Sequence, residues 1–294
     1  MSRHILLVVF LCQVLTAFAG AQRSSDDELA SSVFSQTRAP KLASSIALIY
    51  DEKNQNFLYS KNSETVAPIA SITKLMTAMV VLDAKLSMDE KITISPDDAD
   101  FQKGTHSRMR AGITLPRGEM LKVALMASEN RAAAALARTY PGGTPAAIAA
   151  MNAKAKELGM TATKFLDPTG LNSNNVSTAK DLVKMVMAAQ HYELIHKFTT
   201  STSHMVNAGG RHELKYINTN PLVKNASWDI GVSKTGYISE AGRCLVMEAK
   251  ISNRPVVIVL LDSWGKSTRV GDANRIKKWM ESSVARSARK TNRG

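Results

Sequence analysis

Ser71 and Lys74 are the residues whose types and spacing most directly suggest chemistry in this sequence. The apolar residues beside them recur at the spacing of one helical face: Ile72, Leu75, Met76, Met79 and Val80. Pro68 favours an extended approach, so a helix with one core-facing side is expected to begin near Ser71. Lys74 then stands one turn on, close to the same side. Burial lowers the pKa of a lysine towards neutrality, so the pair predicts a nucleophile beside a possible base.

The Ser-x-x-Lys spacing alone is weak support, because it occurs twice more, at Ser177–Lys180 and Ser263–Lys266. Thr178 and Asp181 resemble the capping pair of another helix, which gives the first repeat a structural explanation. The second repeat falls at a predicted junction between a strand and a helix. The catalytic interpretation of Ser71 therefore depends on whether other polar groups of the chain could act with it.

Two further polar groups could serve such a pair. Ser128 and Asn130 form a polar junction within an alanine-rich helical stretch. Lys234, Thr235 and Gly236 lie in a predicted strand, where the first two supply a cation and a hydroxyl for a substrate carboxylate. A glycine there removes a side chain that would block a ligand from the strand edge. The alternative is an ordinary strand with a surface lysine.

The patterns around these groups predict an α+β fold. Short β-prone runs occur near the start of the chain and in its last third: 45–50, 57–61, 203–206, 212–217, 231–237, 243–251 and 256–261. Helical patterns lie between them and at the end: 71–84, 119–140, 144–159 with Thr144-Pro145 as its opening, 178–190 and 270–280. The simplest packing is one antiparallel sheet with strands from both chain ends and a helical block inserted between them.

The beginning of the chain is expected to be an export signal over residues 1–21. Arg3 and His4 precede an apolar run, and small residues follow it. Residues 22–42 are predicted to be an extended or disordered lead-in. The exported chain then keeps a single cysteine, Cys244, which excludes an internal disulfide and leaves stability to core packing.

The net charge of +13 indicates anionic surroundings. Export argues against nucleic acid as a partner and favours an acidic cell-wall polymer or a membrane surface. Part of the charge lies in 282–294, predicted to be a frayed basic tail with weak contact to a membrane surface. The chain has no His-Glu-x-x-His zinc signature and no Gly-x-Ser-x-Gly turn, so neither a metal nor a cofactor is expected.

The three polar groups follow one another along the chain: Ser71-x-x-Lys74, Ser128-x-Asn130 and Lys234-Thr235-Gly236. Together they resemble the penicillin-recognising serine enzymes, which comprise DD-peptidases and serine β-lactamases. Further segments are similar to the low-molecular-mass D-alanyl-D-alanine carboxypeptidase family: Asp167-Pro168-Thr169-Gly170-Leu171, 177–182, and Tyr237 followed by Ala241-Gly242. The resemblance runs from about Ile46 to Met280. It implies a catalytic domain over 43–281, with an antiparallel sheet flanked by helices and an inserted all-helical subdomain.

The segment after Gly236 has room for two strands and a helix. The extra C-terminal β-domain and membrane-binding helix of the larger carboxypeptidases are therefore expected to be missing, and the chain looks like the compact type-7 penicillin-binding proteins. That resemblance implies a periplasmic D-alanyl-D-alanine endopeptidase. Such an enzyme cuts the D-alanine to diaminopimelate cross-link between peptidoglycan stem peptides and is acylated by penicillins.

The resemblance also implies catalytic roles. Ser71 would attack the carbonyl of a D-alanine with Lys74 as general base. Ser128 would relay a proton to the leaving amine. Asn130 would hold the substrate amide and orient Lys74.

Substrate binding is assigned by the same resemblance to the third group. Lys234 would keep the site electropositive, and Thr235 would bind the terminal carboxylate. The backbone N–H groups of Ser71 and Tyr237 would form an oxyanion hole.

Three alternatives stay open. A DD-carboxypeptidase shares the chemistry and differs in how its cleft admits a second stem. A serine β-lactamase must activate a deacylating water, and 165–176 offers only Asp167 as a carboxylate, so inhibition by penicillin is expected instead. A non-catalytic sensor would not require both Ser71 and Lys74. Glu129 departs from many relatives, with a minor expected effect.

Overall fold

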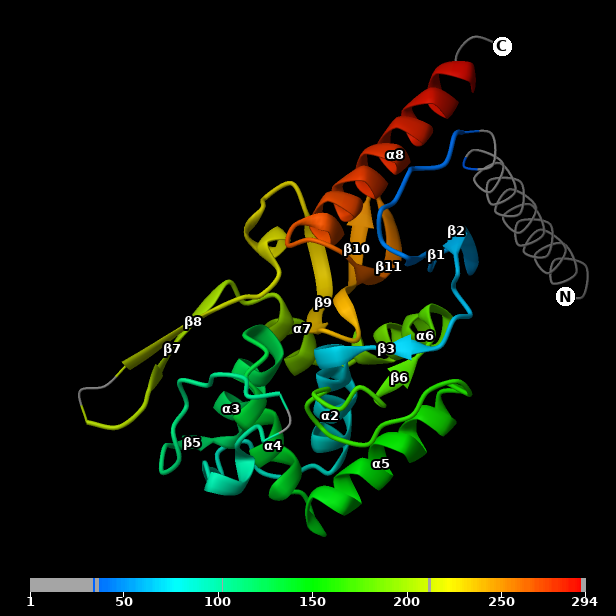
Figure 1. Cartoon of the computed structure of the whole chain (residues 1–294). Helices are drawn as coiled ribbons and strands as arrows, with labels where there is room; N and C mark the ends of the chain where they lie inside the picture. Colours follow the sequence, from blue (N-terminus) through cyan, green and yellow to red (C-terminus); the bar gives the residue numbers. More distant parts are fainter. Residues whose placement is uncertain (1–33, 35–36, 102, 211–212, 292–294) are drawn as a thin grey trace, which may run out of the picture.

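The computed structural model describes residues 34, 37–101, 103–210 and 213–291. Its centre is an antiparallel sheet with the strand order β2-β1-β11-β10-β9 (Figure 1). The strands are β1 (Ile46–Asp51), β2 (Asn56–Lys61), β9 (Asp229–Ile238), β10 (Gly242–Ile251) and β11 (Arg254–Ser263). Strands from both ends of the chain therefore share one sheet, as predicted.

The register of the sheet divides the core into two layers. Leu48 of β1 pairs with Val259 of β11, which in turn pairs with Val246 of β10. These three side chains belong to the core on one face, whereas Ile49 and Ile258 belong to the core on the other. Because both faces are covered, the central strands read as continuous apolar runs.

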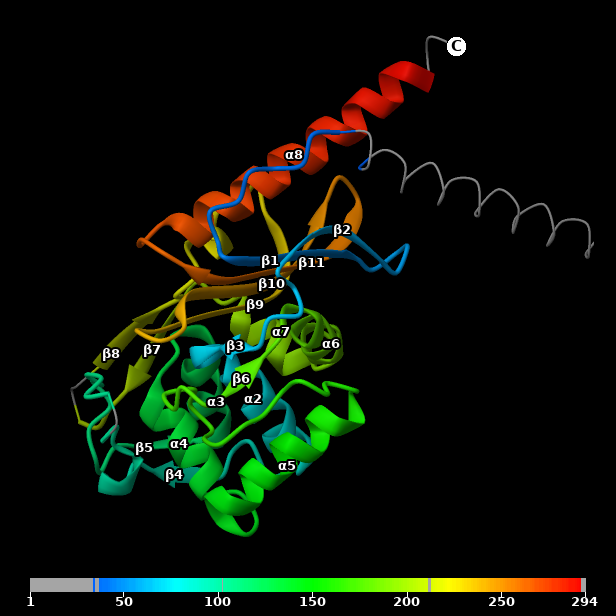
Figure 2. The ribbon, with the colours of Figure 1, turned by 45° about the vertical axis from the view of Figure 1, so that its right-hand side comes forward.

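Helices cover the two faces of the sheet (Figure 2). The long helix α8 (Thr268–Thr291) packs on one face, with four residues of its predicted apolar face in the core: Ala273, Ile276, Trp279 and Met280. On the other face lie α6 (Ala179–Ala189) and α7 (Glu193–Thr199). The other helices between β2 and β9 pack beyond these two (Figure 1).

The inserted block connects β2 to β9. Its remaining helices and 3-10 turns are η1 (Ala70–Ile72), α2 (Thr73–Asp83), η2 (Pro96–Asp98), α3 (Arg117–Met126), α4 (Asn130–Arg138), α5 (Gly143–Glu157) and η3 (Pro221–Lys224). Three strand pairs complete it: β3 (Ala67–Pro68) with β6 (Val176–Ser177), β4 (Lys91–Thr93) with β5 (Thr114–Pro116), and β7 (Ser203–Asn207) with β8 (Glu213–Ile217). The hairpin predicted near residue 210 is the last of these pairs.

Several helix boundaries differ from the sequence patterns. The stretch predicted as helical over 119–140 is two helices, because the chain leaves the helix between α3 and α4 at residues 127–129. Thr144 was expected to cap α5, but the helix begins after Gly142, whose φ of 84° supplies the turn. Thr178 does cap α6, since its Oγ1 accepts a hydrogen bond from Asp181 N at 3.1 Å. The short helix α7 was not predicted.

The structure describes the two terminal segments in part. Residues 1–33, which include the predicted export signal, lie outside the described residues. Within the predicted lead-in, Phe34 is buried, with its ring centroid 5.2 Å from that of Trp279 on α8. The frayed tail predicted from residue 282 is wrong as far as Thr291, because α8 continues through it. Ser283 is buried and donates to Thr37 Oγ1 at 3.0 Å, so the two segments hold each other.

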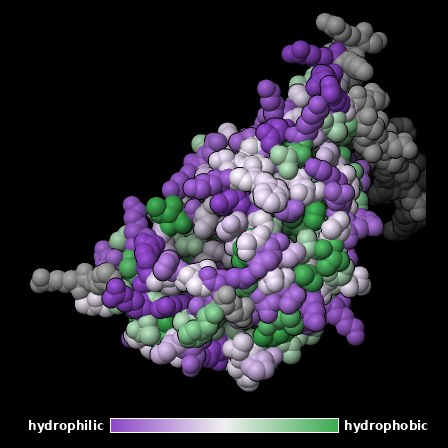
Figure 3. Space-filling model, viewed as in Figure 1, coloured by the Kyte–Doolittle hydropathy of each residue, from purple (hydrophilic) through white to green (hydrophobic). Residues whose placement is uncertain are grey.

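Two observations bear on contact with a membrane. None of the helices that the structure describes has an apolar stretch long enough to cross a membrane. The face shown in Figure 3 is predominantly hydrophilic, and its hydrophobic side chains gather in small, separate patches. Scattered apolar side chains of this kind are ordinary on a protein surface.

Candidate active site

Ser71 lies in η1, directly before α2, at the helix start that the sequence predicted. The prediction of one core-facing side understates the burial of this helix, since every residue from Thr73 to Val81 is buried. Helices α3, α4, α5 and α6 all contact α2, so its polar side also faces protein. Lys74 on that side is consequently shut off from solvent.

Lys74 is 1% exposed, and its ammonium group makes three hydrogen bonds. It donates to Ser71 Oγ at 2.9 Å, to Asn130 Oδ1 at 2.7 Å and to the Thr169 carbonyl oxygen at 2.7 Å. Burial lowers the pKa of Lys74 to about 8. Three carboxylates oppose this effect: Asp167, Glu129 and Asp100. A lysine with this pKa is partly a free amine near neutral pH and can accept the proton of Ser71.

Ser128 and Asn130 lie at the junction of α3 and α4. Ser128 has a φ of 61°, and Asn130 is the first residue of α4. The Ser128 Oγ accepts a hydrogen bond from Lys234 Nζ at 2.9 Å. The Asn130 amide lies between Lys74 and Thr105, whose Oγ1 accepts from Nδ2 at 3.0 Å. Each of these polar side chains therefore meets one of the two lysines.

Lys234 is 1% exposed within β9, which rules out the alternative of a surface lysine. Its Nζ also donates to the Thr235 carbonyl oxygen at 3.0 Å. Burial, followed by the positive charges of Lys74 and Arg269, holds the pKa of Lys234 well below its usual value. The Thr235 hydroxyl donates to Thr219 Oγ1 at 2.7 Å. The site thus combines cationic groups and hydroxyls, which suits a carboxylate ligand.

Gly236 lets β9 lie against η1. A Cβ at Gly236 would stand 3.0 Å from both the Ile69 carbonyl oxygen and Ser71 N. The glycine was predicted to make room for a ligand, but the nucleophile's own turn takes up that space. Ser71 N is thereby held beside the strand that carries Tyr237, whose side chain is 56% exposed.

Asp167 organises the loop beneath Ser71. Its carboxylate accepts hydrogen bonds of 2.6–3.2 Å from the backbone N–H groups of Thr169, Gly170, Leu171 and Asn172. Asn175 Nδ2 donates to it as well, at 2.8 Å. This turn points the Thr169 carbonyl at Lys74. In the part of the chain that the structure describes, no cluster of three His, Cys, Asp or Glu side chains is arranged to hold a metal ion.

Gly170→Ala is expected to disturb this loop. Gly170 has a φ of +82°, and a Cβ there would lie 1.9 Å from the Ala70 carbonyl oxygen. The loop and η1 cannot both keep their places, so the free energy of unfolding should fall by more than about 2 kcal/mol in denaturant titrations. Gly112→Ala is the control, because its φ is +90° but its Cβ would meet nothing within 4 Å, and it should cost about 1 kcal/mol. Equal losses would contradict the explanation by close contact.

Two contributors to the site were not predicted. Thr169 lies in a segment singled out from the sequence, but it acts through a backbone carbonyl that no side-chain type reveals. Arg269, on α8, is 9% exposed, and its Nε and Nη1 find no hydrogen-bond partner among the described residues. Arg269 joins the site only because α8 packs on the sheet, and no local pattern marks it.

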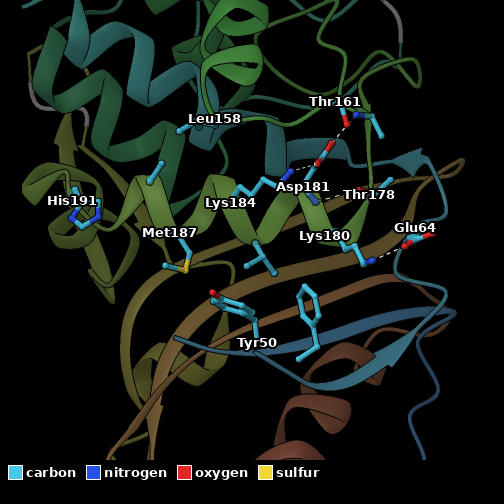
Figure 4. Close-up of a pocket in the computed structure, with 14 residues that line it drawn as sticks. Tyr50, Glu64, Leu158, Thr161, Thr178, Lys180, Asp181, Lys184, Met187 and His191 are labelled. Carbon is cyan, nitrogen blue, oxygen red and sulfur yellow. Dashed lines mark hydrogen bonds and ion pairs between the residues drawn. The ribbon is translucent and has the colours of Figure 1, made fainter. Parts of the chain in front are cut away.

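A groove of about 820 Å³ between α6 and the strands β1 and β2 is a separate feature (Figure 4). None of the eight predicted site residues lines it. Lys180 points into this groove and pairs with Glu64 at 2.5 Å, whereas Ser177 is buried and hydrogen-bonds to Thr163 Oγ1 at 2.7 Å. This Ser-x-x-Lys repeat is therefore structural, as expected from the sequence.

The family model described as D-alanyl-D-alanine carboxypeptidase, peptidase S11, matches residues 33–265. The chain is 48% identical to the D-alanyl-D-alanine endopeptidase of Escherichia coli (strain K12), over 82% of this chain and 78% of that protein.

Solved structures share the fold. The Streptomyces K15 DD-transpeptidase matches with a TM-score of 0.76 and 27% identity, covering 83% of this chain and 99% of that one. Penicillin-binding protein D2 from Listeria monocytogenes, in its cefotaxime-bound form, matches with a TM-score of 0.72 and 28% identity over the same shares. The predicted fold class is confirmed. The chain therefore belongs to the D-alanyl-D-alanine carboxypeptidase family, peptidase S11, as a serine-type DD-peptidase.

Proposed function

We propose that this protein is a D-alanyl-D-alanine endopeptidase that cuts D-alanine to diaminopimelate cross-links of peptidoglycan through an acyl-enzyme on Ser71. The observation that carries the proposal is the 2.9 Å hydrogen bond between Ser71 Oγ and the buried Lys74 Nζ. Similarity to an endopeptidase supports the cross-link as the substrate. The alternative is a D-alanyl-D-alanine carboxypeptidase, which the description of the family supports.

In the acylation step, Ser71 Oγ attacks the carbonyl carbon of D-alanine while neutral Lys74 takes the hydroxyl proton. An ester bond forms, and the C–N bond to the leaving amine breaks. Ser128 gives its proton to that amine, and Lys234, which donates to Ser128 at 2.9 Å, is placed to replace it. Asn130 holds the substrate amide. Water then hydrolyses the ester: its oxygen bonds to the acyl carbon, the Ser71 oxygen leaves and takes back the proton held by Lys74, and the proton that water loses returns to Lys234, so the cycle needs no cofactor.

The transition state and the substrate carboxylate are bound from β9. The backbone N–H groups of Ser71 and Tyr237 form the oxyanion hole, and a donor of this kind is worth about 2.7–4 kcal/mol. The Thr235 hydroxyl receives the carboxylate beside the scissile bond. The positive charges of Lys234 and Arg269 lie near enough to repel each other. A substrate carboxylate relieves this repulsion and is attracted to the site.

Penicillins acylate the same serine in this proposal, and the adduct persists. Deacylation needs a group that activates water. Asp167 is the carboxylate of the 165–176 loop, and it is engaged by four N–H groups of that loop. Asp167 is therefore a poor base for water. This argues against the β-lactamase alternative, which needs a carboxylate in this loop to activate the deacylating water. The cefotaxime-bound penicillin-binding relative supports β-lactams as inhibitors.

The acylation rate is expected to rise with pH and to level off above about pH 8. Lys74 accepts the serine proton only when neutral, and its protonated form dominates below its pKa of about 8. The rate constant of labelling by a fluorescent penicillin, followed from about pH 6 to 10, measures this dependence. A constant rate over that range would contradict Lys74 as the base.

The site of action proposed for this enzyme is the periplasm. Residues 1–21 have the sequence of an export signal, and the substrate lies outside the cytoplasmic membrane. Arg286 and Arg289 are exposed near the end of α8 and could give the protein weak contact with an anionic membrane surface.

Purified muropeptides test the proposal. The mature protein is incubated separately with cross-linked dimers and with monomeric pentapeptides, and the products are resolved by mass. We expect dimers to become monomers with the wild-type protein and to survive with Ser71→Ala. Loss of a terminal D-alanine from pentapeptides while dimers remain intact would establish the carboxypeptidase instead. If neither substrate changed, the proposal would be wrong.

A further inference from the structure

Glu129 stands between Ser128 and Asn130, and the sequence predicted a minor effect for it. In the structure, Glu129 is 8% exposed and both of its carboxylate oxygens accept hydrogen bonds, which gives a reason to expect a larger effect. We infer that Glu129 is a positioning residue that fixes Ser128 and Asn130 by tying their turn to the segment 105–109 and to the β7–β8 hairpin. The inference deepens the proposed function and rests on it.

The carboxylate of Glu129 connects three parts of the chain. Its Oε1 accepts hydrogen bonds from Ser107 Oγ at 2.6 Å and from Arg131 N at 3.3 Å. Its Oε2 accepts from the Tyr216 hydroxyl of β8 at 3.4 Å. The bond from Arg131 N makes Glu129 the N-cap of α4, where a negative charge also interacts favourably with the helix dipole. A buried carboxylate with this set of partners has a defined position.

The two residues that follow Glu129 attach to the same segment. Asn130 Nδ2 donates to Thr105 Oγ1 at 3.0 Å, and Arg131 Nη1 donates to the Met109 carbonyl oxygen at 3.0 Å. Three consecutive residues are thus bound to 105–109. Since Asn130 Oδ1 also accepts from Lys74, a shift of this segment would reach the base directly.

The conformation of Ser128 requires such support. Its φ of 61° is left-handed, which costs a residue with a side chain about 1–2 kcal/mol. Two hydrogen bonds of Glu129 restrain this turn. Glu129 N donates to the Val123 carbonyl oxygen at 3.2 Å, and the Glu129 carboxylate accepts from Ser107 Oγ. Without the carboxylate, Ser128 is free to relax and to leave its hydrogen bond with Lys234.

The charge of Glu129 acts on Lys74 as well. It is one of the carboxylates that raise the pKa of Lys74 against the lowering by burial. The other charged groups that interact with Lys74 come from different elements: Asp167 of the loop before β6, Asp100 after η2 and Lys234 of β9. Around Glu129 itself lie Arg131, Tyr216 and Arg108, whose guanidinium is 4.7 Å from the Tyr216 ring centroid.

Two substitutions separate position from charge. Glu129→Ala removes every bond and should slow penicillin acylation at least about tenfold at constant pH, with the loss in the acylation rate constant rather than in binding. Glu129→Gln keeps an oxygen acceptor for Ser107 but removes the charge, so it should restore most of the rate. It should also move the acid limb of the pH profile down by roughly half to one pH unit. Glu157→Gln, at an exposed glutamate of α5, is the matched control and should change neither quantity.

The experiment measures the rate constant of labelling by a fluorescent penicillin between about pH 6 and 10 for each variant, with circular dichroism as the check of folding. If the wild-type protein is labelled and both Glu129 variants match it in rate and in pH profile, the inference is overturned. It is also overturned if Glu129→Gln is itself about tenfold or more slower than the wild type, because the charge of Glu129 rather than its position would then set the rate; this outcome is readable even where Glu129→Ala does not fold. Absence of labelling in the wild-type protein would instead overturn the proposed function.

Discussion

Ser71→Ala is expected to abolish cleavage of cross-linked muropeptide dimers, with a loss of about 10⁴-fold or more in kcat. The hydroxyl oxygen is the atom that would form the ester. Ser71 contributes little to stability, since among the described residues the hydrogen bond of its Oγ is the one from Lys74 Nζ at 2.9 Å. The melting temperature should therefore change by no more than a few degrees. Product formation followed by mass, together with thermal unfolding, measures both effects.

The chain offers its own control for this experiment. Ser177 opens the second Ser-x-x-Lys sequence, but Lys180 turns away to Glu64. Ser177→Ala removes a buried hydrogen bond to Thr163, so it should lower stability by about 1 kcal/mol and leave cleavage intact. If Ser71→Ala kept appreciable activity, or if Ser177→Ala lost it in the folded state, the assignment of the nucleophile would be wrong.

Lys74→Arg should have the second-largest effect, slowing acylation about 10³-fold. An arginine keeps the positive charge but cannot become neutral in a protein, so it cannot take the proton of Ser71. This variant separates a base from a merely electrostatic partner, which a charge alone would satisfy. The rate constant of penicillin labelling measures the effect, and the protein should remain folded enough for its circular dichroism to be compared with that of the wild type.

Lys180→Arg is the matched control, because Lys180 stands at the same place in the second Ser-x-x-Lys sequence and is partly exposed in its pair with Glu64. It should label at the wild-type rate. If Lys74→Arg labelled as fast as this control, Lys74 would act through its charge, and another group would have to be the base.

The electrostatic design of the site explains why both lysines matter together. Lys74 and Lys234 are each 1% exposed, and the charge of Lys74 is one of the causes of the low pKa of Lys234. Two buried ammonium groups disfavour each other's charged form. The repulsion favours a state in which one lysine is neutral, as proton abstraction from Ser71 requires. The positive charge that remains attracts a negatively charged substrate.

Much of this site could be predicted from the sequence. Each of the three polar groups carries its chemistry in side chains that lie within three residues of one another, and the structure brings the groups together. The sheet was predictable too, because strands that are buried on both faces show as uninterrupted apolar runs, as in β11. Turn chemistry was legible where a side chain acts locally, as Thr178 does at the start of α6.

What the sequence did not reveal depends on contacts between distant residues. The Thr169 carbonyl reaches Lys74 only because Asp167 folds its loop. Glu129 takes its partners Ser107 and Tyr216 from other segments of the chain, so the sequence did not indicate its burial. The helical period of α2 showed one apolar side, but the other side is covered by neighbouring helices, which no local pattern encodes. Helix α8 likewise extends beyond its predicted apolar face, because Thr37 and Phe34 from the start of the described chain pack along it.

If Ser71 is the nucleophile, a penicillin must be attached to its side chain after the reaction, and the position of the covalent bond shows whether it is. The mature protein is treated with a penicillin and digested, and the modified peptide is identified by mass spectrometry. We expect one adduct for each protein molecule, on the peptide that contains Ser71, and none on the peptides with Ser177 or Ser263. An adduct on either of those serines, or an unmodified Ser71 in a labelled protein, would contradict it.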